Sequence, residues 1–432
     1  MNNSLLLQNV KLSNGVSQDI LIVGEHISQV GVGLTGAEKV IDCTGLIALS
    51  GFVDLHTHLR EPGSEQSETV LSGSRAAAKG GFTAVHAMAN TSPVADNAAV
   101  VEQVYALGKK AGYVQVQPIG AVTVNLEGKQ LADLGKMNLS EATVTIFSDD
   151  GKCVSDSLVM RRALEYVKAF NGVIAQHAQD PLLTVNAQMN EGELSLKLGL
   201  TGWPKVAEQA IIARDVLLAE EVGSRLHVCH VSTKGSVEII RWAKARGISV
   251  TAEVTPHHLL LTESLASDYN PVFKVNPPLR TAEDVQALRE AVADGTIDII
   301  ATDHAPHPAD SKDCEWGEAA FGMVGLETAA SIAKTTLIDT GLIDWVRFEE
   351  LLSINPSRIS GLVDQGQSLI EGSFANITLM NPDVSMNVTD DSESKSANNP
   401  YVGMSLSGSV VHTIFKGTVT VLDGKVQSIG NN

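Results

Sequence analysis

The chain has 432 residues, of which 44% are hydrophobic and 19% charged, so it has the composition of a globular protein and room for one large domain and a small one. Its 31 basic and 50 acidic residues leave a formal net charge of −19, which disfavours nucleic acids and anionic membranes as partners, because both require basic surface. We see no signal peptide, no apolar run of membrane length and no CxxC pair among the four cysteines, so we expect a cytoplasmic protein with reduced thiols.

Short β-prone segments alternate with longer helical patterns through the middle of the chain, which is typical of repeated βα units and a parallel sheet. The predicted strands are 52–58, 82–88, 114–120, 143–149, 172–177, 226–231, 248–254 and 297–303. The predicted helices are 67–79, 97–111, 157–169, 205–222, 234–246 and 282–293. Eight such strands predict an α/β fold of the closed (β/α)8, TIM-like kind, whose reactive groups lie at the carboxyl ends of the strands.

The two ends of the chain differ from this middle part. Residues 5–48 and roughly 366–430 contain short alternating strands with turn residues and no helical companion. Because an isolated set of hairpins is only marginally stable, we expect both ends to pair into one small β-sandwich domain. The predicted domains are therefore a barrel at 51–363 and a small β domain made of 1–50 and 364–432.

The motif HTH places His56 and His58 at the end of the first predicted strand. Residues i and i+2 of a strand point to the same side, so both imidazoles project into the mouth of the barrel. His177 ends the fifth predicted strand, His230 the sixth and Asp303 the eighth. Imidazole and carboxylate groups suit zinc and similar divalent ions, so this combination predicts a metal site.

The other histidines lack such a matching placement. A lone strand histidine is more often packed or exposed than bound to a metal. We expect structural roles for His26, His86, His227, His257, His258, His304 and His412.

A set of motifs extends over nearly the whole chain. They are GFVDLHTHLREPG, AMANTSP, FSDDG, VIAQHA, HVCHVST, EVTPHHL, KVNPPLR, ATDHAPH, FGMVGLE and GMSLSGSVVHTIFKGTVT. In this combination the sequence resembles the amidohydrolase superfamily, and within it the bacterial dihydroorotases that use a bridging aspartate. HxHLREPG together with MANTSP and NPPLR is far more specific than HxH alone.

The resemblance implies a site for one or two zinc or similar divalent ions, with His56, His58 and Asp303 on one ion and His177 and His230 on the other. One carboxylate should lie between the ions.

The end of the fourth predicted strand departs from the commoner arrangement in the superfamily, which uses a carboxylated lysine. The resemblance favours Asp150 as the bridging group and leaves Asp149 as a hydrogen-bonding turn residue. A carboxylated Lys152 stays open as the alternative.

The implied reaction is the reversible cyclisation of N-carbamoyl-L-aspartate to L-dihydroorotate, a step of de novo pyrimidine biosynthesis. A hydroxide held between the ions would attack, and Asp303 would act as general acid–base catalyst. Arg60 lies two residues beyond the HTH motif and suits a substrate carboxylate bidentately. By the resemblance, Asn90 and His307 complete that carboxylate pocket and Asn276 contacts the ring.

Two other interpretations remain open at this point. One is another cyclic amidohydrolase, such as a hydantoinase or an allantoinase; the other is a non-catalytic homologue that acts as a scaffold for aspartate transcarbamoylase. Besides a small-molecule substrate, the resemblance leaves open a homodimer and an association with aspartate transcarbamoylase. The polar segment 306–318 follows the last strand, and we expect it to close over the substrate.

Overall fold

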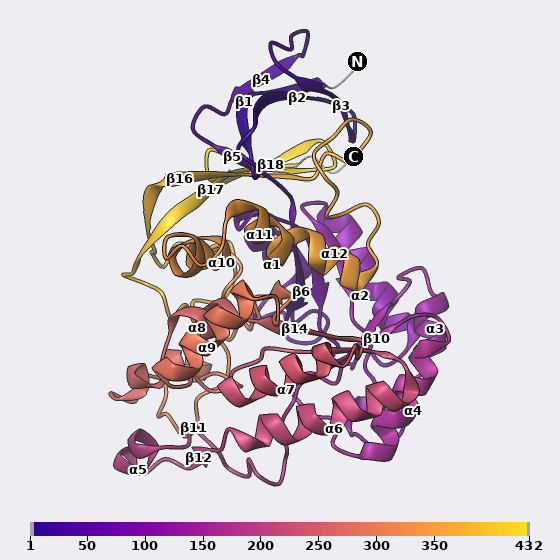
Figure 1. Ribbon diagram of the computed structural model, residues 1–432, viewed down its shortest axis with the longest axis vertical. Coiled ribbons are helices and arrows are strands. Elements are labelled where there is room, and N and C mark those ends of the chain that lie inside the picture. The colour runs from indigo at the N-terminus through magenta and orange to yellow at the C-terminus, as the bar shows by residue number, and fades with distance from the viewer. Residues whose placement is uncertain (1–3, 430–432) are drawn as a thin grey trace.

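The computed structural model describes residues 4–429 and combines a parallel barrel with a sheet at one end of the molecule (Figure 1). The barrel strands are β6 (Phe52–Thr57), β7 (Phe82–Ala87), β8 (Gln115–Pro118), β9 (Ile146–Phe147), β10 (Val173–Gln176), β13 (Arg225–Val228), β14 (Val250–Val254) and β15 (Ile299–Ile300). They form two parallel runs, β6-β7-β8 and β9-β10-β13-β14-β15. Parallel bridges from Gly120 to Phe147 and from Thr57 to His304 join the runs into a ring, which confirms the predicted (β/α)8 fold.

Six long helices follow barrel strands in chain order. They are α1 (Val70–Lys79), α2 (Ala98–Ala111), α4 (Ser157–Lys168), α6 (Val206–Val222), α7 (Lys234–Ala245) and α9 (Ala282–Ala293). All but α6 begin after a residue whose side chain accepts hydrogen bonds from the first turn, which stabilises the helix end. Their bounds agree with the predicted helices to within three residues, the largest difference being the start of α1 at Val70. None of the helices within 4–429 has the length and apolarity that crossing a membrane requires.

Shorter helical segments complete the remaining connections. They are α3 (Leu134–Leu139), α5 (Glu193–Leu198), α8 (Pro256–Leu260), α10 (Ala329–Ala333), α11 (Trp345–Glu349) and α12 (Asn355–Ser360), with 3-10 turns at 124–126, 263–266, 271–273 and 309–311. Two π-helical stretches, 334–338 and 350–354, continue α10 and α11. A two-stranded ladder of β11 (Met189–Asn190) and β12 (Gly202–Trp203) flanks α5.

Regular pairing in β9 and β15 covers only two residues each, which is shorter than the predicted strands. The chain beyond them turns into the barrel mouth, and Asp303 adopts a left-handed backbone with φ 48°. Both strands lack regular pairing at the start of the predicted range as well as at its end, where 148–149 and 301–303 lead to the site.

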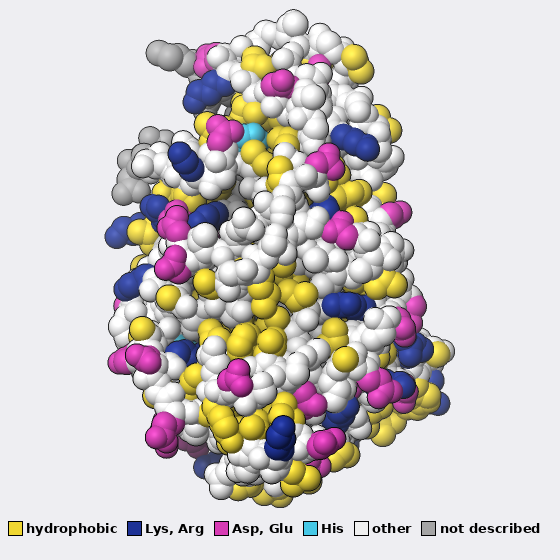
Figure 2. Space-filling model, turned by 90° about the vertical axis from the view of Figure 1, so that its left-hand side faces the viewer, with side chains coloured by type: hydrophobic (Ala, Val, Ile, Leu, Met, Phe, Trp, Pro, Cys, Tyr) yellow, Lys and Arg dark blue, Asp and Glu magenta, His cyan; other side chains and the backbone are white. Residues whose placement is uncertain are grey.

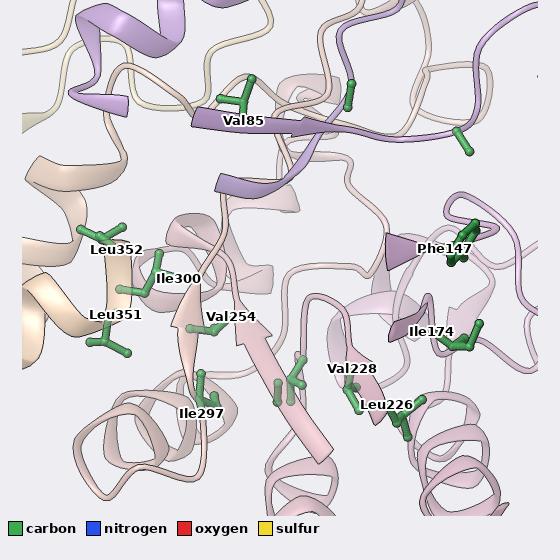
Figure 3. Close-up of a cluster of buried hydrophobic side chains, with 14 of the residues drawn as sticks. Val85, Phe147, Ile174, Leu226, Val228, Val254, Ile297, Ile300, Leu351 and Leu352 are labelled. Atoms are coloured by element: carbon green, nitrogen blue, oxygen red, sulfur yellow. The ribbon is translucent and has the colours of Figure 1, made fainter. Parts of the chain in front are cut away.

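Alternate residues of the barrel strands separate into two apolar clusters. Val173, Ala175 and Ile299 belong to one cluster. Their neighbours Ile174 and Ile300 belong to the larger cluster drawn in Figure 3. This alternation is that of barrel strands with one face toward the interior and one toward the surrounding helices.

A nine-stranded sheet unites the two ends of the chain. Its strands are β1 (Ser4–Leu12), β2 (Ser17–Val23), β3 (His26–Gly31), β4 (Lys39–Asp42), β5 (Ile47–Ser50), β16 (Ile377–Asn387), β17 (Ser405–Phe415), β18 (Thr418–Leu422) and β19 (Lys425–Val426). The antiparallel pair of β5 and β16 joins the ends, and strands from both ends share one apolar core with Leu7, Ile22, Leu379 and Ile414. The small β domain made from both ends is therefore confirmed, while the boundaries at 50/51 and 363/364 stay a prediction.

Charges of both signs are interspersed on the face of the molecule shown in Figure 2, where hydrophobic side chains gather near the centre. Such mixing is expected for a chain with 31 basic and 50 acidic residues.

Candidate metal centre and substrate pocket

The first half of the predicted centre comes from β6 and the segment after β15. Nε2 of His56 lies 3.3 Å from Asp150 Oδ1 and 3.4 Å from Asp303 Oδ1. Nε2 of His58 lies 3.1 Å from Asp303 Oδ1 and 3.3 Å from Asp150 Oδ2. All four side chains are buried, so these contacts lie in an environment of low dielectric constant.

The second half comes from the ends of β10 and β13. Nδ1 of His177 and Nε2 of His230 lie 2.8 Å apart, and each is 3.3 Å from Asp150 Oδ1. The carboxylate of Asp150 is therefore shared by all four histidines. That placement is the one a bridging carboxylate requires.

The donor atoms of this cluster fit a divalent cation. Ligand atoms of His56, Asp150 and His230 lie within 4.8 Å of one another, and so do those of His56, His58 and Asp303. Nε2 of His56 is buried and has no hydrogen-bond partner, although a buried polar atom without a partner is unfavourable. Nitrogen and carboxylate oxygen donors at this spacing match the ligand set of zinc.

Both carboxyl groups of the cluster are ionised at neutral pH. Burial raises the pKa of Asp303, but the charges of His56 and the hydrogen bond of His58 outweigh it and lower that pKa to about 2. Burial likewise opposes the ionisation of Asp150, but His56 and His177 hold its pKa well below the usual value. The protein therefore presents two negative ligands to a cation.

Asp149 and Lys152 lie outside the cluster. The carboxylate of Asp149 accepts hydrogen bonds from the backbone N–H of Val122 at 2.8 Å, from that of Thr123 at 2.9 Å, and from the Thr123 hydroxyl. The side chain of Lys152 is exposed. The geometry thus favours Asp150 as the bridging residue over both alternatives.

Glu253, at the end of β14, supports the cluster and was missed by the sequence analysis. Its Oε1 accepts hydrogen bonds from His56 Nδ1 at 2.6 Å and from the backbone N–H of His230 at 3.1 Å. Its Oε2 lies 3.0 Å from Nε2 of His227, whose Nδ1 contacts the hydroxyl of Thr251 at 2.8 Å. The position of Glu253 at the end of a buried barrel strand is the signal that could have revealed it.

His304 faces away from the centre, as its position directly after Asp303 predicts. Its Nε2 lies 3.4 Å from Glu68 Oε2, and its Nδ1 accepts a hydrogen bond from Gly325 at 3.2 Å. Its contacts are structural ones.

Three residues of the site adopt the left-handed backbone that non-glycine residues rarely use. They are Arg60 at φ 62°, His230 at φ 33° and Asp303 at φ 48°. Each such residue costs on the order of 1–3 kcal/mol, and such residues cluster at functional sites.

The predicted carboxylate pocket adjoins the cluster. Nδ1 of His58 donates to Asn90 Oδ1 at 2.9 Å, and Nε of Arg60 donates to Pro306 O at 3.1 Å. A guanidinium nitrogen of Arg60 lies 3.3 Å from Nε2 of His307. Within 4–429 the side-chain hydrogen bonds of Arg60 involve Pro306 and His307 and no carboxylate, and burial lowers the pKa of its guanidinium only to about 10. The charged group is therefore available to an anionic ligand.

Two loops hold these pocket residues next to each other. The backbone N–H of Ser92 donates to Pro62 O at 2.9 Å. Gly63 has φ 102°, and a Cβ there would collide with Ser92. Glycine is therefore needed for the loop that carries Arg60 to pack against the loop that carries Asn90.

Asn276 lies on another side of the site. Its Nδ2 donates to Gln179 Oε1 at 3.2 Å, while its Oδ1 is buried without a partner. The structure thus leaves one acceptor of Asn276 unused, as a ligand contact would require.

The segment 306–318 is attached to the neighbouring loop by two buried lysines. Nζ of Lys312 donates to Pro271 O at 3.0 Å and to Lys274 O at 2.9 Å. Nζ of Lys274 donates to Trp316 O at 2.6 Å. Closure of this segment over the substrate stays a prediction.

Solved structures share the architecture of this chain. An L-hydantoinase (dihydropyrimidinase) from Arthrobacter aurescens aligns with a TM-score of 0.88 and 25% identity over 99% of this chain and 98% of that chain. A dihydropyrimidinase from Brevibacillus agri NCHU1002 aligns with a TM-score of 0.83 and 21% identity over 98% and 96% of the two chains, which shows the fold alone. The fold is thus that of the TIM-barrel amidohydrolases with a β-sandwich domain.

Relatives found by sequence show to which family of the TIM-barrel amidohydrolases the chain belongs. Residues 45–236 match the family described as "Dihydro-orotase-like". A protein of Leifsonia xyli subsp. xyli named "Dihydroorotase" is 62% identical over 99% of this chain and 98% of its own length. Proteins of the same name from Streptomyces coelicolor and Mycobacterium tuberculosis are 61% and 50% identical, each over 98% of this chain. The chain belongs to the dihydroorotase family, which confirms the resemblance.

Proposed function

We propose that this protein is a dihydroorotase, which interconverts N-carbamoyl-L-aspartate and L-dihydroorotate. The observation that carries the proposal is the direct contact between the two predicted subsites. Asn90 Oδ1 accepts from His58 Nδ1 at 2.9 Å, so the carboxylate pocket with Arg60 begins where the metal-ligand cluster ends. A substrate that needs both must carry a carboxylate beside the amide that reacts, as dihydroorotate does.

The residues that would hold divalent ions are His56, His58 and Asp303 for one ion and His177 and His230 for the other, with Asp150 between them. Zinc is the ion that we propose, because its preferred donors are those present. When bound, such ions activate water near neutral pH and polarise the carbonyl that is attacked.

The pocket residues would orient the substrate. The fork of Arg60 would bind the α-carboxylate through two parallel hydrogen bonds, with His307 and Asn90 at its sides. Burial, together with the charge of Arg60, lowers the pKa of His307 to about 3, so this imidazole is neutral and adds no second charge. Asn276 would hold the ring through its free Oδ1.

Asp303 would transfer the proton during the reaction. With a pKa of about 2 its carboxylate is in the basic form at neutral pH. Its Oδ1 is engaged by His58 at 3.1 Å, which leaves Oδ2 to accept the proton of the attacking water. The same oxygen would return the proton to the ring nitrogen as the amide bond breaks.

The test is turnover of dihydroorotate, hydantoin and allantoin by the purified protein, before and after metal removal with a chelator. We expect turnover of dihydroorotate alone, its loss with the metal and its recovery with added zinc. Preferential turnover of hydantoin or allantoin would support the other cyclic amidohydrolases, and no turnover by the zinc-loaded protein would support the non-catalytic scaffold.

We also propose that the protein is located in the cytoplasm. All four cysteines are unpaired, which agrees with a reducing cytoplasm. A homodimer and an association with aspartate transcarbamoylase stay predictions, and size-exclusion chromatography of the chain, alone and mixed with that enzyme, tests both.

A further inference from the structure

A hydrogen-bond relay beside the metal-ligand cluster runs through Thr184, Gln179 and His177, and the donor and acceptor of each of its hydrogen bonds can be assigned. The hydroxyl of Thr184 donates to Asp180 O at 2.8 Å, so its single proton is committed there. The same oxygen contacts Nε2 of Gln179 at 2.8 Å and must accept from it. The amide nitrogen of Gln179 therefore faces Thr184.

The carbonyl oxygen of Gln179 consequently faces the site. Gln179 Oε1 lies 2.8 Å from Nε2 of His177. Because a carbonyl oxygen only accepts, the proton of His177 sits on Nε2 and the lone pair on Nδ1. Nδ1 is the atom that lies 3.3 Å from Asp150 Oδ1 and 2.8 Å from His230 Nε2, so the relay directs the electron pair of His177 into the cluster.

The same oxygen also orients Asn276. Nδ2 of Asn276 donates to Gln179 Oε1 at 3.2 Å. The amide of Asn276 is thereby turned so that Oδ1 remains without a partner, although it is buried. An acceptor presented in this way suits an N–H group of a cyclic amide.

We propose that Gln179 is a positioning residue that sets the tautomer of a metal-ligand histidine and the orientation of a substrate-binding asparagine through one oxygen atom. The metal-side role depends only on His177 and its place in the cluster. The substrate-side role rests on the proposed function, because it assumes a ring with an N–H donor near Asn276.

Variants at two positions of the relay test this proposal. Gln179→Leu removes the shared acceptor, and we expect zinc affinity to fall about 10- to 100-fold in competition with a chromophoric chelator, as with other partners of ligand histidines. With zinc in excess, KM for dihydroorotate should rise about tenfold while kcat changes less, since the lost orientation is worth about one hydrogen bond. Gln179→Glu keeps an acceptor at this place and should restore both quantities to within about threefold of the wild type.

A second substitution keeps the test decisive if Gln179→Leu does not fold, which thermal melting will reveal. Thr184→Val frees the amide of Gln179 to flip and should move zinc affinity and KM in the same directions by a smaller amount. The matched control is Gln286→Leu on the exposed side of α9. The amide of Gln286 donates to Glu290 at 2.9 Å, and its loss should change neither quantity.

A double variant measures the link between the two ends of the relay. In the Gln179→Leu background, Asn276→Ala should raise KM less than it does in the wild type, because the orientation of Asn276 is already lost. Wild-type zinc affinity or wild-type KM in a folded Gln179→Leu variant would overturn the proposal, as would full additivity of the two substitutions. If the wild-type chain does not turn over dihydroorotate, the proposed function fails, and the zinc measurement still decides the role of Gln179 toward His177.

Discussion

The barrel mouth and the nine-stranded sheet both carry histidines on or beside strands, but the polar groups of these histidines are satisfied in different ways. In the sheet, Nδ1 of His412 accepts a backbone hydrogen bond at 3.1 Å, and His26 stacks on Phe374 at 4.4 Å between ring centroids. In the mouth, Nε2 of His56 is buried without a partner, and Asp303 has a left-handed backbone. The sheet therefore contributes stability, whereas the mouth holds unfavourable features that the surrounding fold maintains.

The largest expected effect is the loss of the carboxylate shared by the four histidines. Asp150→Ala should reduce turnover of dihydroorotate at least about 10³-fold and lower the zinc content, because both ion positions lose a common ligand. Zinc content by atomic absorption and steady-state kinetics measure this. The control is Asp133→Ala, which removes an exposed carboxylate that pairs with Lys136 at 2.8 Å. Full zinc and full turnover in Asp150→Ala would assign the bridging role to Asp149 or to a carboxylated Lys152.

A core substitution in the sheet should lower stability and leave turnover unchanged, in contrast to Asp150→Ala. Leu379 is fully buried, so Leu379→Ala should lower the free energy of unfolding by about 2–5 kcal/mol and leave kcat/KM unchanged below the melting temperature. Urea denaturation measures the loss, and Val363→Ala, at 84% exposure, serves as the control with little change. A large loss of activity in folded Leu379→Ala would mean that the sheet takes part in the reaction.

Removal of the pocket guanidinium separates recognition from metal binding. Arg60→Ala should raise KM for dihydroorotate about 100-fold at unchanged zinc content, because a charge-assisted bidentate contact is worth a few kcal/mol. Arg75→Ala is the control, since that partly exposed guanidinium pairs with Glu393 at 2.7 Å. Unchanged kinetics of Arg60→Ala on dihydroorotate would remove this residue from the pocket.

The smallest expected effect per step of the measurement, here one pH unit, concerns the buried Lys312 near the mouth. Burial lowers its pKa from 10.5 to about 7, so the unfolded chain binds more protons than the folded chain between these two values. The free energy of unfolding should therefore rise with pH above about 7, by about 1 kcal/mol per pH unit, whereas below pH 7 both states are protonated and the gain is absent. Urea denaturation midpoints at several pH values measure this rise. The variant Lys312→Met should lack the rise. If stability changes with pH in the same way in both proteins, the lowered pKa of Lys312 is contradicted.

The sequence predicted those features of the fold and of the site that follow from a pattern within one helix or strand. The six long helices were predicted to within three residues because their apolar spacing and capping residues are local. The convergence of His56, His177, His230 and Asp303 was predicted because strand ends of a parallel barrel meet at one rim. Family resemblance, and no local pattern, pointed to Asn90 and His307.

Glu253 and Gln179 escaped the sequence analysis for a physical reason. Glu253 contacts His56 across 197 positions of the chain, and Gln179 contacts Asn276 across 97. Hydrogen bonds between such distant residues depend on the packing of whole strands and loops, which no spacing rule encodes. For the same reason the contact between His227 and Glu253, at 3.0 Å, was not predicted.

Residue types and their periodicity alone determined the alternation of strands and helices, the eightfold barrel and the rim where its polar residues gather, because these follow from side-chain spacing along one element. Only the tertiary structure decided which oxygen of which carboxylate the histidines share, and which amide atom each asparagine presents. Those choices depend on hydrogen bonds between separate elements, whose geometry exists only once the barrel has closed.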